Sequence, residues 1–207
     1  MPAHPPVRSA PGRGSALIEL ALALTFAFPL LLGVGSVGIR LGRTLEATEL
    51  TRDVAHLYAL GADFSLPGTQ AIASKLSVDS NLSSTGKTVL VFSRIYRVLQ
   101  TDCTAAGVSP CTNLNQPVFT QRIVMGNPAL RTSEFGTPAA GYIDSAGNIT
   151  AAHYCKQTSL VAVGFDSVLT LAAGQSTTVV EGYFAMPEIN FLNLPNSGGG
   201  YYVRFLY

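Results

Sequence analysis

A single carboxylate stands at the head of a long apolar run near the start of this chain. Glu19 directly precedes Leu20–Ile39, a stretch of 20 residues without a charged side chain. An acid in a helix that crosses a membrane costs roughly 2.5 to 3.5 kcal/mol near the bilayer centre and less near its surface. An ordinary membrane anchor would carry an apolar residue there. The sequence therefore predicts that Glu19 has a specific use, the alternative being an acid that is solvated or protonated at the interface.

The cysteines and histidines are the other side chains with distinctive chemistry. The three cysteines, Cys103, Cys111 and Cys155, form no CxxC pair, and the three histidines do not have the spacing of zinc ligands. We therefore expect no metal site. In an oxidising compartment a disulfide is favoured, and the short loop from Cys103 to Cys111 makes these two the expected pair. A bridge from either of them to Cys155 remains an alternative.

No arrangement of residues indicates catalysis. His153 lies close to Cys155 in the sequence, but no nucleophile context such as GxSxG is present. We expect neither enzymatic activity nor a cofactor, and we expect Glu181 and Arg204 to lie on strand surfaces. The net charge is +1 with 12% charged residues, and no basic block could neutralise phosphates, which argues against nucleic acid as a partner.

We expect the apolar run itself to form a helix. At about 1.5 Å per residue it measures roughly 30 Å, the thickness of the hydrocarbon layer of a bilayer. We expect a membrane span over about 17–39, with Pro29 and Gly33 as sites of helix flexibility. The Pro-rich leader, residues 1–14, is expected to be a cytoplasmic tail. An ordinary signal peptide cleaved near residue 36 is the other interpretation, although the run is longer than is typical of one.

Beyond Arg40 the pattern becomes amphipathic. Leu45, Leu50 and Val54 recur at helical spacing, and Gly61 is a plausible helix stop. The sequence thus predicts one long helix over 15–61, whose second half packs against the domain that follows.

Residues 62–207 are predicted to form an α+β domain. A short helix is expected over 67–82 and a long loop over 126–151. The Val-, Thr- and aromatic-rich stretches that predict strands, mostly antiparallel, are 88–99, 118–125, 158–165, 167–172, 177–186 and 201–207. We expect the sheet to pack on the amphipathic half of the long helix.

The N-terminal region resembles a known family. The segment GSALIE, from Gly14 to Glu19, resembles the processing site of type IV prepilins, and the first 60 or so residues are similar to TadE-like pseudopilins of the tight adherence (Tad) pilus. One departure is Leu20, where related sequences often have an aromatic residue. The resemblance implies a type IV pilin-like fold and cleavage between Gly14 and Ser15 by a prepilin peptidase, with Glu19 as the fifth residue of the mature chain.

The resemblance also implies a function for the acid. Cleavage frees the α-amine of Ser15, which can pair with Glu19 of a neighbouring subunit as the helices pack together. The chain would then be a minor pilin or pseudopilin in the bacterial inner membrane. Its N-terminus would be cytoplasmic, its C-terminal domain would be periplasmic or extracellular, and its partners would be other pilins and platform proteins. The alternatives are an unprocessed, membrane-anchored binding or adhesion domain and a secreted hydrolase.

Overall fold

A computed structural model describes residues 13–76, 81–185 and 199–207 of this chain. By compactness the chain divides into two units, Met1–Arg43 and Thr44–Tyr207, which we describe separately. The helices, strands and 3-10 turns are α1 (Arg13–Ala59), α2 (Pro67–Leu76), β1 (Thr88–Arg97), α3 (Gln100–Ala105), β2 (Pro117–Gly126), η1 (Ala140–Tyr142), α4 (Ala151–Tyr154), η2 (Thr158–Leu160), η3 (Phe165–Ser167), β3 (Ser176–Ala185) and β4 (Gly200–Leu206).

In the first unit, helix α1 is long and apolar enough to cross a membrane. Between residues 17 and 39 nearly all of its large apolar side chains are exposed, with Leu17 at 69% and Ile39 at 53%. A helix that is apolar on all sides and has no protein around it is suited to lipid or to other helices rather than to water. The predicted long apolar helix is therefore confirmed, and its length and composition are compatible with a membrane span.

Helix α1 ends where the sequence predicts. Gly61 has φ +94°, a backbone conformation that glycine adopts without steric cost. Its N–H donates to the Tyr58 carbonyl at 3.0 Å, and the Ala62 N–H donates to the Leu57 carbonyl at 3.0 Å. These two bonds form a Schellman motif, which satisfies carbonyls that the end of a helix would otherwise leave unpaired.

The second unit contains a four-stranded antiparallel sheet with the order β2-β1-β3-β4, so the predicted α+β class is confirmed. The pairing of β1 with β2 shifts between Arg94 and Ile95. Thr120 is the extra residue at this bulge, because Gln121 pairs with Arg94 and Phe119 with Ile95.

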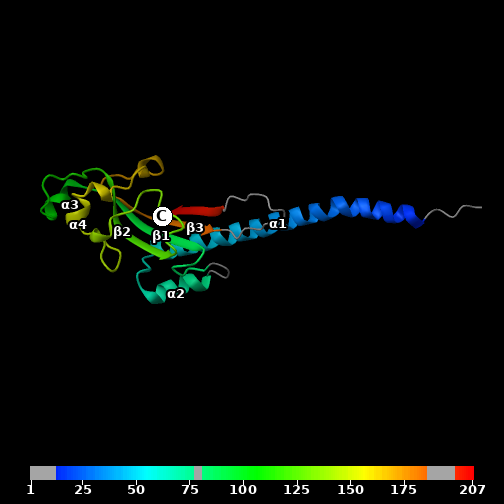
Figure 1. Cartoon of the computed structure of the whole chain (residues 1–207). Coiled ribbons are helices and arrows are strands. Elements are labelled where there is room, and N and C mark those ends of the chain that lie inside the picture. The colour runs from blue at the N-terminus through cyan, green and yellow to red at the C-terminus, as the bar shows by residue number, and fades with distance from the viewer. Residues whose placement is uncertain (1–12, 77–80, 186–198) are drawn as a thin grey trace, which may run out of the picture. The chain divides into compact units, whose positions relative to one another are not determined.

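One face of the sheet packs against the C-terminal part of α1 (Figure 1). The helix contributes Leu50, Val54 and Tyr58 to this core, and Phe92 of β1 stacks on Phe64 with ring centroids 4.4 Å apart. This is the predicted packing of the sheet on the amphipathic part of the helix. The part of α1 from Thr44 onward therefore belongs to the same compact unit as the sheet.

The opposite face is covered by the chain between β2 and β3. Phe135, Leu160 and Phe165 of this segment are buried against Ile95 and Val179 of the sheet. The predicted 126–151 loop is thus a packed layer. Its turn near Asp144 bonds to β2 through the Arg122 N–H and the Gly147 carbonyl at 2.7 Å.

Two of the predicted strands, 158–165 and 167–172, are wrong. These segments form η2 and η3, joined through Gly164, whose φ of +72° breaks any extended run. Only an isolated bridge links Val161 to Val118 of β2. Of the apolar residues that suggested strands, Leu160, Ala162, Phe165 and Leu171 are buried by packing onto the sheet, and that burial requires no ladder of backbone hydrogen bonds.

Candidate functional site

The predicted processing and assembly residues lie at the start of α1. The Gly14–Ser15 bond falls within the first turn of the helix, and Glu19 is exposed on its surface. Residues four apart in a helix lie on the same face. The backbone thus places Ser15 and Glu19 one turn apart along one side of α1.

The other polar side chains of the apolar run are satisfied by the helix itself. The Thr25 hydroxyl donates to the Ala21 carbonyl and the Ser36 hydroxyl donates to the Gly33 carbonyl, each at 2.8 Å. Hydroxyls that bond back to the preceding turn are compatible with an apolar surrounding. Glu19 is the acidic side chain that directly precedes the apolar run, and the centre of a bilayer would disfavour its charge.

Pro29 and Gly33, the predicted sites of flexibility, lie inside α1. The helix is continuous at both positions, although Pro29 cannot donate a backbone hydrogen bond. A Cβ atom added at Gly33 would meet no atom within 4 Å. Flexibility at these residues stays a prediction.

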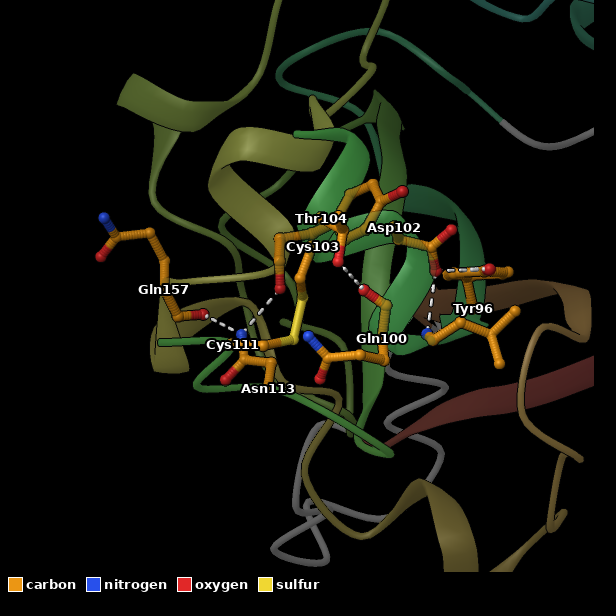
Figure 2. The surroundings of a disulfide bond; sticks show 10 residues. Tyr96, Gln100, Asp102, Cys103, Thr104, Cys111, Asn113 and Gln157 are labelled. Atoms are coloured by element: carbon orange, nitrogen blue, oxygen red, sulfur yellow. Dashed lines mark hydrogen bonds between the residues drawn. A yellow bond between two sulfur atoms is a disulfide. The ribbon is translucent and has the colours of Figure 1, made fainter. Parts of the chain in front are cut away.

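The disulfide joins Cys103 of α3 to Cys111 with a Cα–Cα distance of 5.7 Å (Figure 2), which confirms the expected pair. Asp102 fixes the start of α3, because its Oδ2 accepts hydrogen bonds from the Tyr96 hydroxyl at 2.6 Å and the Leu99 N–H at 2.8 Å. Beyond the bridge, Asn113 Nδ2 donates to the carbonyls of Tyr154 and Gln157, both at 2.8 Å.

Cys155 is free and buried in the same apolar cluster as Cys103. Burial, with a smaller contribution from the charge of Asp102, raises the pKa of the Cys155 thiol. A thiol of this kind is a poor nucleophile at neutral pH. The His153 ring packs on Tyr142 with centroids 5.0 Å apart.

A buried pair of opposite charges is the feature that sequence reasoning missed. Glu181 of β3 and Arg122 of β2 are 3% and 5% exposed, so the expected surface position of Glu181 is wrong. Arg122 Nη1 lies 4.0 Å from Glu181 Oε2. Burial lowers the pKa of Arg122 to about 10, and the charge of Glu181 opposes this shift.

Hydrogen bonds from this pair hold the segment of residues 127–136, which we call the strap. Glu181 Oε1 accepts from the Glu134 N–H at 3.0 Å and from the Tyr202 hydroxyl at 2.7 Å. Arg122 Nη2 donates to the Gly136 carbonyl at 2.7 Å. Burial and the bond to Glu181 raise the pKa of the Tyr202 hydroxyl.

Two more arginines form the outer part of this cluster. Arg131 pairs with Glu134 at 2.5 Å and lies over the Tyr202 ring at 4.4 Å. Arg204 of β4 lies 3.8 Å from Glu134 and over the Phe135 ring at 5.0 Å. Arg204 is therefore only partly exposed, at 24% of its side chain, and is not simply a surface residue.

A signal for this cluster exists in the strand pattern. Val179, Glu181 and Tyr183 alternate onto one face of β3, and burial of Val179 on that face would imply burial of Glu181. The missing information is the layer that covers this face, because the sequence predicts a loop over 126–151 and strands over 158–165 and 167–172 instead.

Comparison with protein-family models, with curated proteins and with solved structures gives no match for this chain. Within residues 13–76, 81–185 and 199–207, no group of three or more His, Cys, Asp or Glu side chains could hold a metal ion. The chemistry that these residues offer is ion pairing, at the head of α1 and beneath the strap.

Proposed function

We propose that this chain is a minor pilin or pseudopilin of a Tad-type pilus, processed by a prepilin peptidase and assembled through α1. The observation that supports this is the position of Glu19, one helical turn from the Gly14–Ser15 bond and directly before a span of 20 uncharged residues. In a pilin such an acid can pair with a charge on a neighbouring subunit. In an ordinary membrane anchor it only makes insertion into the bilayer less favourable.

Cleavage after Gly14 creates a positive charge that can pair with Glu19 of a neighbouring subunit. The new α-amine of Ser15 is largely protonated at neutral pH. A carboxylate and an ammonium group in a medium of low dielectric constant stabilise each other strongly, whereas each alone is penalised. Pairing of the amine on one subunit with Glu19 on the next would select the register in which their helices pack.

The other proteins in this proposal follow from the same step. A prepilin peptidase is needed to cut the bond, other pilin subunits provide the helices against which α1 packs, and inner-membrane platform proteins move the subunit into the filament. The domain of residues 62–207 would then be displayed outside the cytoplasm, where the Cys103–Cys111 bridge is stable.

N-terminal sequencing of the mature protein from a bacterium with a prepilin peptidase tests the processing step. We expect Ser15 as the first residue, and we expect Gly14→Val to block cleavage. Gly12→Val, two residues upstream in the same leader, is the matched control and should leave cleavage intact. A protein that begins at Met1 would favour a membrane-anchored binding domain, and a start near residue 36 would indicate a secreted protein; either would overturn the proposal.

Glu19→Gln tests the assembly step. We expect the variant to enter the membrane at least as well as the wild type, because a charge has been removed from the span, but to be depleted from sheared filaments. Glu46→Gln, further along the same helix, is the control and should assemble normally. Normal incorporation of the Glu19 variant would contradict the role of the acid.

A further inference from the structure

A small recess lies beneath the strap, on the sheet face that the strap covers. Its lining includes Val91 and Glu181 from the sheet, Arg131 and Ser133 from the strap, and the rings of Tyr183 and Tyr202. There is room for about one water-sized group beside Arg131. The recess thus combines a carboxylate with aromatic rings, the surroundings that a cationic group prefers.

The carboxylate at the base of this recess is only half satisfied. Glu181 is 3% exposed, and its Oε1 accepts two hydrogen bonds. Its Oε2 accepts none from the described residues. The guanidinium of Arg122 lies 4.0 Å away, beyond hydrogen-bond distance. A buried carboxylate oxygen without a donor is costly, so this atom marks where a donor would bind with most gain.

Arg131 closes the recess without reaching that oxygen. Its guanidinium lies over the Tyr202 and Tyr183 rings at 4.4 and 5.7 Å and pairs with Glu134 at 2.5 Å. The Arg131 side chain is 38% exposed and that of Glu134 is 45% exposed. Ion pairs as exposed as this one contribute little stability, and a cation that replaces Arg131 would regain the contacts with the two rings.

The charge balance of the cluster indicates that Arg131 is the residue that another basic group could replace. Among the residues that the structure describes, the ion pairs of Arg122, Arg131 and Arg204 involve two carboxylates, Glu134 and Glu181. Adding a further cation would increase the excess of positive charge, whereas replacing Arg131 by another basic group would leave the balance unchanged. Arg122 is buried and bonded to the Gly136 carbonyl, which leaves Arg131 as the outermost cation of the recess.

We propose that this recess is a docking site for a lysine or arginine side chain of a partner protein, which takes the place of Arg131 and donates a hydrogen bond to Glu181 Oε2. In the isolated subunit, Arg131 occupies the aromatic part of the site. The displaced Arg131 moves into solvent with the strap residues beside it. This inference does not depend on processing at Gly14 or on assembly through α1.

Tyrosine-labelled full-length protein in detergent micelles, observed by NMR, tests the proposal. Ethylguanidinium and butylammonium are the probes, ethylurea is the neutral analogue, and Tyr202→Phe assigns the Tyr202 signal. We expect Arg131→Gln to lower the ethylguanidinium concentration that half-shifts the Tyr202 signal by about tenfold relative to wild type. Arg52→Gln, at another exposed arginine, should not change it, and adding Glu181→Gln to Arg131→Gln should abolish the gain.

A measurement on the wild-type protein tests the proposal even if the variants do not fold. In wild-type protein labelled at arginine instead of tyrosine, the Arg131 Nε–H signal should move towards that of a solvated arginine as ethylguanidinium displaces Arg131. Three results would overturn the proposal: an equal response to ethylurea, no gain on Arg131→Gln, or an affinity that Glu181→Gln leaves unchanged. If the Arg131 variants do not fold, an Arg131 signal that stays in place at saturating probe overturns it.

Discussion

Arg122 and Glu181 remove two charges from water in the middle of a sheet face that is otherwise mostly apolar. Such a pair contributes little net stability compared with an apolar pair, but removal of one partner leaves the other charge buried alone. The strap depends on both residues, because each bonds to its backbone. We therefore expect single substitutions at Arg122 or Glu181 to be strongly destabilising, although the intact pair adds little net stability.

Glu181→Ala should lower the free energy of unfolding by about 3 kcal/mol or more, because Arg122 loses its counter-charge inside the protein. Urea unfolding followed by circular dichroism measures this. Glu134→Ala is the matched control: its carboxylate is 45% exposed, so its loss should cost about 1 kcal/mol or less. Equal costs for the two variants would contradict the assignment of Glu181 as a buried charge.

Tyr58 should make the domain sensitive to alkali. Burial raises the pKa of its hydroxyl from 10.0 to about 12, and this hydroxyl donates to Gln121 Oε1 at 2.8 Å. The folded state therefore keeps a proton that the unfolded state loses first. The resulting stability is fully present below pH 10 and is lost as the pH rises towards about 12.

The measurement is thermal unfolding between neutral and strongly alkaline pH. Tyr58→Phe should flatten the alkaline decline, at the cost of one hydrogen bond at neutral pH. Tyr207→Phe, at a tyrosine that is 48% exposed, serves as the control. If the decline is as steep in Tyr58→Phe as in wild type, burial of this hydroxyl is not the cause.

At the scale of elements, contact between α1 and β3 requires a strand residue without a side chain. A Cβ atom on Gly182 would lie 2.6 Å from Thr51 Oγ1 and 2.9 Å from the Phe184 ring. Thr51 is buried, and its hydroxyl donates to the Ala47 carbonyl at 2.7 Å. Gly182 thus sets how closely the helix approaches the sheet.

Gly182→Ala should destabilise the domain by about 1 to 3 kcal/mol, because it overpacks this contact. Thr51→Ala removes the atom that the new methyl group meets and should recover part of the loss in the double variant. Gly141→Ala is the control, since a Cβ atom there meets nothing within 4 Å. Urea midpoints of the wild type, the two single variants and the double variant measure the coupling between Gly182 and Thr51. Purely additive effects would contradict a direct contact.

Whether an element could be predicted from the sequence depends on whether local or long-range interactions stabilise it. The strands β1, β2, β3 and β4 and the end of α1 were predicted from alternation, β-branched residues and a glycine stop, which are local signals. The segments around Leu160 and Leu171 are equally apolar, but their burial comes from packing on the sheet. A pattern of hydrophobic residues alone does not separate those two cases.

The candidate sites differ in the same way: one is contiguous in the sequence and the other is assembled by the fold. The Gly14 to Glu19 segment is contiguous, so it can be recognised in the sequence. The cluster beneath the strap brings Arg122, Glu134, Glu181 and Arg204 together from separate elements. Its recognition requires the sheet order and the register, and neither follows from composition.

At the scale of the whole molecule, the two compact units are suited to different surroundings. The first is an exposed apolar helix, whereas the second has a packed core of its own. The core residues that α1 contributes, from Ala47 to Tyr58, belong to the second unit. A shortened protein that begins at Thr44 should therefore keep this core and be soluble, with the Cys103–Cys111 bridge formed.

Membrane fractionation and circular dichroism check this expectation. The full-length chain should sediment with membranes and resist extraction by carbonate, because a helix of this length and hydropathy partitions into the bilayer. The protein that begins at Thr44 should remain in the supernatant with a cooperative unfolding transition. Aggregation of the shortened protein would show that the domain depends on the preceding residues.

The sheet order has a kinetic consequence for a chain made from its N-terminus. Strand β1 lies between β2 and β3, and its β3 partners, such as Phe184 opposite Thr88, follow roughly 80 to 96 residues later. At about 5 to 20 residues per second, translation leaves β1 without this neighbour for roughly 5 to 20 seconds. During that interval the unpaired edge of β1, a strand in which six of the ten residues are apolar, is available for mispairing. The nascent chain would therefore benefit from a chaperone until β3 has emerged.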